Sequence, residues 1–319
     1  MNSNSRIQEM LKHLNKEQLE KLTAAIRNTK INVLLVGGTG VGKSSTINAL
    51  FDMDTAKVGQ GTKPETSQLE SFEFDHIVIW DTPRFGDSEE NDKRYKEAIV
   101  QKLNEKDKNG LALIDLVLLI IDGSSRDYSS AYTIIKDVVY PNLGETGKQR
   151  LLVGINQADL AMKGRHWNHE TNQPEQALTD FLEEKVQSTR ERIKADTGLD
   201  VEPIYYAAGY KDGDEEQHPY NLEKLLSHIL EQLPEKKRFV FMSDVNDDKQ
   251  NFSSNDGKED YSKKIEETVE DSFWNTIKST LSDLADMALN AVKEAAKEMI
   301  TPENVKTVAK TLFSIFSKK

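Results

Sequence analysis

The chain has 319 residues, enough for about two domains. It is 37% hydrophobic and 30% charged and has no cysteine, which excludes a collagen-like chain, a disulfide scaffold and any cysteine nucleophile or thiolate zinc site. The net charge of −12 argues against bare nucleic acid as a partner, because phosphate neutralisation needs Lys and Arg. The longest aliphatic run, 116–121, is far shorter than a membrane span, and the first residues lack the apolar core of a signal peptide. A cytoplasmic protein is therefore expected.

The first two hundred residues or so alternate between two kinds of apolar pattern. Residues 5–28 carry apolar side chains at steps of three and four, which predicts an amphipathic helix. Short apolar runs that are typical of buried strands follow at 31–36, 71–74, 77–80, 116–122, 151–155 and 202–206. Helical patterns separate most of them, at about 95–103, 131–138, 174–195 and, after the last, 220–232. The alternation predicts an α/β fold with a mostly parallel sheet flanked by helices.

The C-terminal part has a different character. Residues 243–262 are polar and acidic, which predicts a flexible linker. From 265 to 299 the apolar residues form one helical stripe, which would pack on the preceding domain, dimerise or lie on a membrane surface. The tail, 303–319, sets lysines beside apolar residues, which suits either an interfacial helix on anionic lipid or a groove of the same chain.

Residues 37–44, GGTGVGKS, fit the phosphate-binding pattern G-x-x-x-x-G-K-[ST] between a predicted strand and a predicted helix. The glycines let backbone N–H groups face phosphate oxygens without a Cβ in the way. Lys43 would supply charge to the β and γ phosphates, and Ser44 would offer its hydroxyl to Mg²⁺. The predicted phosphate-binding residues are Gly37, Gly38, Thr39, Gly40, Val41, Gly42, Lys43, Ser44 and Ser45.

Later motifs indicate which nucleotide is bound. Asp81 ends a predicted strand in IWDTP, where it could hold Mg²⁺ directly or through water. In NQAD, Asn156 can bond the N7/O6 edge of guanine, and Asp159 can accept from N1–H and the 2-amino group, which adenine does not offer in that arrangement. In AAG, the backbone N–H of Ala208 can face guanine O6. The predicted base-binding residues are Asn156, Gln157, Asp159, Ala207, Ala208 and Gly209.

These motifs, in this order and each after a strand, resemble the translation-factor-related GTPases of the Era, TrmE and septin branch. GGTGVGKSSTINALF followed by VIWDTP is most similar to the small prophage-associated and ribosome-binding-type GTPases of bacteria. The resemblance spans about 31–233 and implies a Ras-like G domain that hydrolyses GTP to GDP and phosphate with Mg²⁺ and acts as a nucleotide switch. It also implies a switch threonine that closes on Mg²⁺ and the γ-phosphate. Thr66 is favoured over Thr62 because it lies just before the strand pattern that starts near Leu69.

Three residues depart from the family pattern. Arg84 replaces a glycine whose N–H meets the γ-phosphate. This change would weaken switching and hydrolysis or have little effect on them. Alternatively, Arg84 would act as a cis arginine finger. Phe85 stands where some GTPases have a water-orienting glutamine, so a partner or dimerisation would have to position the water. Gln157 replaces a lysine that packs over the base, and guanine recognition should survive this change. Slow intrinsic hydrolysis is expected. The alternative is a nucleotide-binding scaffold or membrane-associated assembly protein with negligible turnover.

The expected organisation is an N-terminal helix (1–30), a G domain (31–234), an acidic flexible linker (235–263) and a C-terminal helical region (264–319). The expected partners are guanine nucleotide, and an effector or a second copy bound through the C-terminal helices. Peripheral membrane contact would run through 303–319. His166 and His169 are interpreted as solvated loop residues rather than metal ligands.

Overall fold

The computed structural model of the protein describes residues 15–51, 57–60, 69–82, 89–144, 150–212 and 215–281. Its strands are β1 (Ile31–Gly37), β2 (Lys57–Gln60), β3 (Glu70–Glu73), β4 (Ile77–Asp81), β5 (Leu116–Asp122), β6 (Leu151–Asn156), β7 (Trp167–Asn168), β8 (Gln173–Pro174), β9 (Ile204–Tyr205), β10 (Tyr210–Asp212) and β11 (Glu215–Gln217). Its α-helices are α2 (Lys16–Arg27), α3 (Lys43–Leu50), α4 (Glu89–Asn104), α5 (Ser129–Ile134), α6 (Tyr140–Asn142), α7 (Gln176–Thr197), α8 (Leu222–Gln232), α9 (Glu235–Phe241) and α10 (Tyr261–Thr280). Shorter turns are the π-helix η2 (Ile135–Val139) and the 3₁₀ segments η4 (Ala158–Gly164), η5 (Met242–Asp244) and η6 (Lys249–Phe252).

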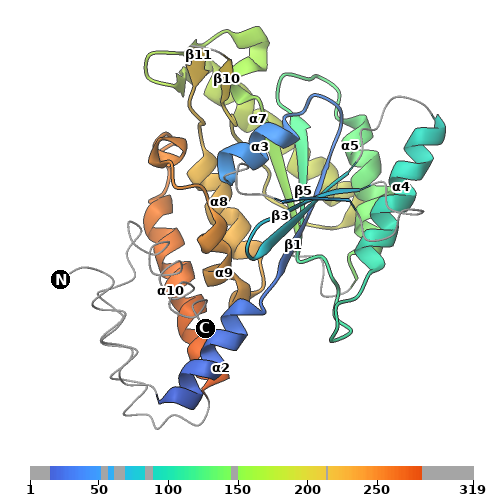
Figure 1. The fold of residues 1–319 in the computed structure, drawn as a ribbon. Helices are drawn as coiled ribbons and strands as arrows, with labels where there is room; N and C mark the ends of the chain where they lie inside the picture. Colours follow the sequence, from blue (N-terminus) through green and yellow to red (C-terminus); the bar gives the residue numbers. More distant parts are fainter. Residues whose placement is uncertain are drawn as a thin grey trace.

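One seven-stranded sheet organises the molecule, in the order β2-β3-β4-β1-β5-β6-β9 (Figure 1). β3 runs antiparallel to β2 and β4, and every other pairing is parallel. β1 is central and all seven of its residues are buried. The predicted mostly parallel α/β sheet is therefore confirmed.

Two hydrophobic clusters cover the two faces of the sheet. The alternation along β1 sends Ile31, Val33 and Leu35 into one cluster and Leu34 and Val36 into the other. The first cluster also receives side chains from α2, α3, α8, α9 and α10, and the second receives them from α4, α5, η2 and α7. Figure 1 shows α8, α9 and α10 on one side of the sheet and α4 and α5 on the other.

The predicted strands and helices lie close to those observed, and the additional elements are short. The described part of the N-terminal helix, α2, begins with a capping box in which Asn15 and Gln18 satisfy each other's backbone N–H groups. The sequence patterns missed β2 and two hairpins. The strands of the β7–β8 hairpin have two residues each, and those of the β10–β11 hairpin have three. These strands are too short to show an alternation of apolar and polar residues.

The helices α9 and α10 belong to the same core as the sheet. Phe239 and Phe241 of α9 are 1% and 0% exposed, and Phe239 packs on Phe273 of α10 with ring centroids 4.8 Å apart. Lys237 of α9 forms a 2.7 Å ion pair with Asp115, which precedes β5. The stripe predicted from 265 to 299 is helical as far as it is described, and its apolar residues from Ile265 to Leu281 are buried. Its described part therefore packs on the domain.

The flexible linker predicted over 235–263 is wrong. Its first residues form α9, and the following polar segment is held by hydrogen bonds to distant backbone groups. Asp244 Oδ2 accepts from the N–H groups of His76 and Ile77 at 2.7 and 2.9 Å. The backbone N–H of Asn246 donates to Leu50 O at 2.8 Å, and Asn251 Nδ2 donates to Ala49 O at 3.2 Å. The bonds of Asn246 and Asn251 close the C-terminal end of α3, whose last carbonyl groups have no partner within the helix.

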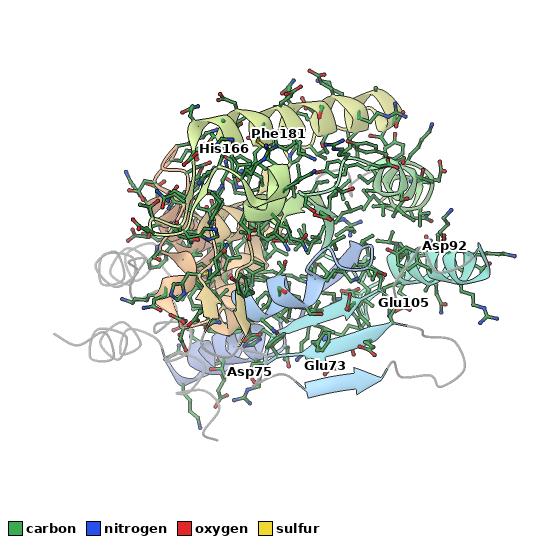
Figure 2. All side chains as sticks on the ribbon, turned by 90° about the horizontal axis from the view of Figure 1, so that it is seen from above. Glu73, Asp75, Asp92, Glu105, His166 and Phe181 are labelled. Carbon is green, nitrogen blue, oxygen red and sulfur yellow. The ribbon has the colours of Figure 1, made fainter. Side chains whose placement is uncertain are left out.

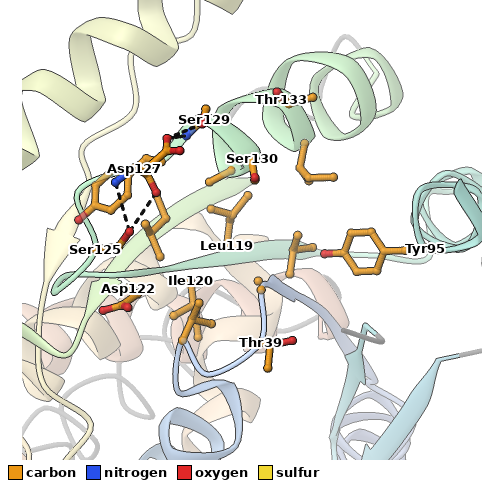
Figure 3. Close-up of a pocket in the computed structure, with 18 of the residues that line it drawn as sticks. Thr39, Tyr95, Leu119, Ile120, Asp122, Ser125, Asp127, Ser129, Ser130 and Thr133 are labelled. Carbon is orange, nitrogen blue, oxygen red and sulfur yellow. Dashed lines mark hydrogen bonds between the residues drawn. The ribbon is translucent and has the colours of Figure 1, made fainter. Parts of the chain in front are cut away.

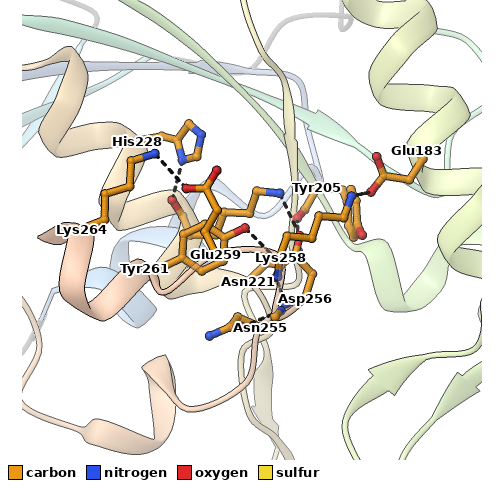
Figure 4. A network of polar contacts seen from close by, with 12 residues as sticks. Glu183, Tyr205, Asn221, His228, Asn255, Asp256, Lys258, Glu259, Tyr261 and Lys264 are labelled. Atoms are coloured by element: carbon orange, nitrogen blue, oxygen red, sulfur yellow. Dashed lines mark hydrogen bonds and ion pairs between the residues drawn. The ribbon is translucent and has the colours of Figure 1, made fainter.

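Polar contacts connect the end of the same segment to α8 and α10 (Figure 4). Asp256 forms an ion pair with Lys224 at 2.8 Å, and its Oδ1 accepts from the Tyr261 hydroxyl at 2.8 Å. The backbone N–H of Asp256 donates to Asn221 Oδ1, just before α8. Segment 243–262 is polar because its side chains cap and brace other elements, not because it lacks structure.

Among the described residues, no helix is long and apolar enough to cross a membrane. The stripe beyond Leu281 and the tail 303–319 lie outside the described residues, so the expected membrane contact stays a prediction.

Candidate nucleotide-binding site

The predicted site residues meet at the carboxyl ends of the parallel strands. Gly37 ends β1, Asp81 ends β4 and Asn156 ends β6. Leu35 pairs with Asp81, and Asp122 pairs with Asn156, so these strand ends lie at the same edge of the sheet. Ligands of open α/β sheets bind at this edge.

The phosphate loop enters α3 through a left-handed residue. Gly42 has φ 86° and is the N-cap of α3. A Cβ at Gly42 would lie 2.2 Å from Asn156 Nδ2, so both the backbone angle and the space require glycine. The residue that the phosphate motif demands is thus also the one that lets Asn156 approach the loop.

The side chain of Lys43 lies inside the phosphate loop. It is 9% exposed, and Nζ donates to Gly37 O at 3.0 Å and lies 3.9 Å from Asp81 Oδ1. The ammonium group therefore stands between the phosphate loop and the carboxylate at the end of β4. This is where the charge of a bound triphosphate would need it.

The residues that could hold Mg²⁺ offer the right kind of ligand. Ser44 lies in the first turn of α3 and is exposed, and the Asp81 side chain is 18% exposed beside Lys43. A hydroxyl and a carboxylate are hard oxygen ligands of the kind that Mg²⁺ prefers. The third predicted ligand, Thr66, lies outside the described residues.

Asn156 links the phosphate loop to the base-binding loop. Its Nδ2 donates to Val41 O at 2.9 Å, and its Oδ1 accepts from the N–H of Ala208 at 2.9 Å. The residue is 2% exposed. The Ala208 N–H that was predicted to face guanine O6 is thus engaged with Asn156 in this structure. An amide has a second N–H, which leaves one donor of Asn156 for the base.

Gln157 braces the phosphate loop from the outside. It adopts a left-handed conformation with φ 61°, and its Nε2 donates to Gly40 O at 2.6 Å. Glutamine at position 157, where the family pattern has lysine, therefore still donates a hydrogen bond to the phosphate loop.

Asp159 is buried at the start of η4, with 8% of its surface exposed. Burial raises the pKa of Asp159, while hydrogen bonds from its own N–H, from the Gln217 side chain and from the N–H of Leu160 act in the opposite direction. A carboxylate that is short of water is a strong acceptor for the N–H groups of a base.

The sequence did not predict the further polar contacts at the site. Thr82 Oγ1 donates to Leu35 O at 2.9 Å and lies 3.4 Å from the Tyr95 hydroxyl. Burial raises the pKa of Tyr95, so this hydroxyl stays protonated. On the base side, the hydroxyl groups of Thr46 and Tyr206 are 2.8 Å apart and connect α3 to the segment after β9. Tyr95 was predictable only as a buried helix position.

A cavity of about 610 Å³ opens beside the phosphate loop (Figure 3). Its lining includes Gly37, Gly38 and Thr39 of the loop and Tyr95 of α4. Neither Asn156 nor Asp159 lines it, so the cavity is distinct from the predicted base site.

Two hairpins stand on the base side of the site. The β7–β8 hairpin follows His166, whose Nδ1 lies 2.9 Å from Glu175 Oε2. Figure 2 shows His166 and Phe181 on the side of the molecule opposite Glu73 and Asp75. The β10–β11 hairpin directly follows AAG. His166 and His169 are both exposed, as predicted, and the loop around them forms a short hairpin.

Four residues that the sequence associates with switching are not placed by the structure. Thr62 and Thr66 fall in 61–68, and Arg84 and Phe85 fall in 83–88, both of which lie outside the described residues. Their roles stay predictions.

Comparison with known proteins gives a family match within the first half of the chain. Residues 32–157 match the sequence model of the family described as "50S ribosome-binding GTPase". The uncharacterized protein YkfA of Escherichia coli (strain K12) is 29% identical over 149 residues, which make up 46% of this chain and 46% of that protein. The match thus spans about half the length of this curated relative.

Two solved structures similar to this chain are described as a probable GTP-binding protein and as a complex with Mg²⁺ and GMPPNP. A probable GTP-binding protein engB is 24% identical, with 63% of this chain and 97% of that chain covered and a TM-score of 0.36. Toc33 from Arabidopsis thaliana in complex with Mg²⁺ and GMPPNP is 17% identical, with 66% and 85% covered and a TM-score of 0.39. The strand order and the phosphate loop give this chain the fold of a P-loop G domain, and residues 32–157 are similar to the GTPase family.

Proposed function

We propose that this protein binds GTP in preference to ATP and hydrolyses it to GDP and phosphate with Mg²⁺, slowly when alone. The observation that carries the proposal is the position of Asn156, which donates to Val41 O of the phosphate loop and accepts from the Ala208 N–H. One side chain thereby joins the loop for phosphates to both loops for the base. The match of residues 32–157 to a GTPase family supports the same function.

The chemistry follows from the charges around the phosphate loop. The backbone N–H groups of the loop and the dipole of α3 favour the phosphate oxygens. Lys43 would neutralise the charge that develops on the β and γ phosphates during in-line attack by water. Ser44 and Asp81 would hold Mg²⁺, which supplies further neutralisation of phosphate charge when it is bound. Asp159 would accept from N1–H and the 2-amino group, which makes the site specific for guanine.

Equilibrium binding of GTP and ATP, together with multiple-turnover phosphate release with and without Mg²⁺, tests the proposal. We expect GTP to bind more tightly than ATP, and phosphate release that requires Mg²⁺. Tight GTP binding without release would favour the scaffold alternative. Equal binding of ATP and GTP would contradict the roles given to Asn156 and Asp159.

Replacing Asp159 by asparagine should change the preferred base. Loss of the hydrogen bonds to a charged acceptor lowers GTP affinity by roughly 10- to 100-fold, since such bonds contribute about 1.5–3 kcal/mol each. Xanthosine triphosphate should gain affinity, because the Asn amide can accept from its N1–H and donate to its 2-oxo group. Binding of both nucleotides to Asp159→Asn measures the exchange.

Asp180→Asn is the matched control for this change. Asp180 is an exposed aspartate of α7, so its replacement should leave both affinities unchanged. A uniform loss of both nucleotides in Asp159→Asn would mean that Asp159 supports the fold rather than the base.

Replacing Arg84 by glycine tests the switch. We expect Arg84→Gly to release phosphate from GTP severalfold faster than the wild type, because glycine lets the backbone N–H meet the γ-phosphate without a Cβ. Single-turnover hydrolysis and GTP binding separate catalysis from affinity. A rate that falls a hundredfold or more would instead identify Arg84 as a cis arginine finger.

A further inference from the structure

The carbonyl group of Gly42, in the phosphate loop, is held by the helix that follows. Thr46 of α3 donates to Gly42 O twice, from its backbone N–H at 2.9 Å and from its hydroxyl at 2.8 Å. A trans peptide group is planar, so a carbonyl that points along the helix sets the N–H of the next residue, Lys43, in the opposite direction. Lys43 is the first residue of α3, and its N–H has no partner within the helix and is available to a phosphate.

Tyr206 extends this contact toward the base side of the site. Its hydroxyl is 2.8 Å from Thr46 Oγ1, and both residues are buried. Because Gly42 O can only accept, the single proton of the Thr46 hydroxyl goes to Gly42, and the Tyr206 hydroxyl donates to Thr46. Burial raises the pKa of Tyr206, so this donor keeps its proton. The three groups form a chain of hydrogen bonds that runs from Tyr206 to the phosphate loop.

Tyr206 itself is fixed by the strand and loop that carry the base-binding residues. Its backbone N–H donates to Ile155 O at 2.9 Å, and its carbonyl accepts from the N–H of Ala158 at 3.1 Å, so these two bonds bracket Asn156. Its ring lies against β6, where a Cβ at Gly154 would be 2.8 Å from the ring Cε1. The tyrosine cannot shift without moving this loop, and its hydroxyl is therefore a donor in a fixed position.

We propose that Tyr206 is a positioning residue for the phosphates of the nucleotide, whose hydroxyl orients the Gly42–Lys43 peptide group through Thr46. The inference rests on the proposed function, since it assigns a role in binding the same nucleotide. Tyr206 acts on the phosphate loop from below the site and contacts neither phosphate nor base. It therefore raises the affinity for the triphosphate part of the nucleotide without discriminating between bases.

Equilibrium binding of GTP, ATP and inorganic triphosphate to the full chain and to Tyr206→Phe tests this role. Phenylalanine keeps the ring and removes only the hydroxyl. We expect GTP and inorganic triphosphate to lose affinity by the same factor, about three- to tenfold, with the ratio of GTP to ATP affinity unchanged. A loss confined to GTP, with a lower ratio of GTP to ATP affinity, would overturn the inference, because Tyr206 would then support only the base-binding loop.

Two variants of Thr46 test the chain of hydrogen bonds. Thr46→Val keeps the shape of threonine without the hydroxyl and should lower the affinity for inorganic triphosphate at least as much as Tyr206→Phe does. Thr46→Ser retains the hydroxyl and should retain most of this affinity. Because Tyr206 acts through Thr46, adding Tyr206→Phe to Thr46→Val should cause no further loss, and additive losses would contradict the chain.

Tyr261→Phe is the matched control. Tyr261 is also buried, and its hydroxyl donates to Asp256 Oδ1 at 2.8 Å, so its loss should lower thermal stability and leave all three affinities unchanged. If Tyr206→Phe behaved in the same way, Tyr206 would support only the fold, and the inference would fail while GTP preference in the wild type stands. A wild-type protein that binds GTP and ATP equally would instead contradict the proposed function, and the affinity for inorganic triphosphate would still test Tyr206.

Discussion

A chain that ends at Pro234 is expected to be unfolded and unable to bind GTP, although it contains every nucleotide-binding motif. The cut removes α9 and α10, whose aromatic side chains complete the core on one face of the sheet. Phe239, Phe241 and Phe273 are each at most 1% exposed, and burial of such side chains contributes about 1.5–3 kcal/mol each, against a total stability of about 5–15 kcal/mol. Thermal unfolding by circular dichroism and equilibrium GTP binding measure the outcome.

Ending the chain at Pro234 also removes the contacts at the C-terminal end of α3. Asn246 and Asn251 bond the carbonyls of Leu50 and Ala49, and Val245 pairs with Phe51. The ring of Phe51 lies 5.6 Å from that of Phe241. The segment after Pro234 thus supports α3 directly.

A chain that ends at Leu281 is the control for this truncation. It retains the described part of α10 and removes only 282–319, so we expect it to unfold cooperatively and to bind GTP. If the chain ending at Pro234 folded and bound GTP with the affinity of the full chain, residues 235–281 would be an independent appendage.

Gly42→Ala is expected to lower GTP affinity by at least about a hundredfold, because strain of about 1–3 kcal/mol adds to a steric conflict. The conflict is specific, since the new Cβ would lie 2.2 Å from Asn156 Nδ2. Asn156 would have to leave Val41 O, and its link to the Ala208 N–H would move with it. Phosphate and base recognition should therefore fail together, which titration with GTP and with inorganic triphosphate would show.

Gly198→Ala separates backbone strain from the conflict with Asn156. Gly198 ends α7 with φ 76°, and nothing lies within 4 Å of the Cβ that alanine would add. This variant should lose about 1 kcal/mol of stability and keep the wild-type GTP affinity. A Gly42→Ala protein that resembles Gly198→Ala in both measurements would show that Asn156 adapts without cost.

Much of the site could be predicted from short segments because its chemistry depends on local backbone demands. Gly42 must adopt a left-handed conformation before a helix, and Lys43 must follow it, so the phosphate loop is readable as a pattern. The strands that end at Asp81 and Asn156 were readable because buried parallel strands are continuous apolar runs.

The polar segments were harder to interpret, because a polar side chain does not reveal its partner. Asn246 and Asn251 belong to a stretch whose composition is typical of a linker, yet they bond carbonyl groups about 200 positions earlier in the chain.

The sequence by itself determined the parallel core of the sheet and the phosphate loop, and it predicted the groups offered to a guanine nucleotide, because these depend on periodic burial and on residue type. Only the tertiary structure decided that α9 and α10 complete the core and that Asn156 ties the phosphate loop to the base loop. The physical reason is that hydrogen bonds and close packing between distant segments depend on where folding brings each group. Composition and spacing record only which groups are present.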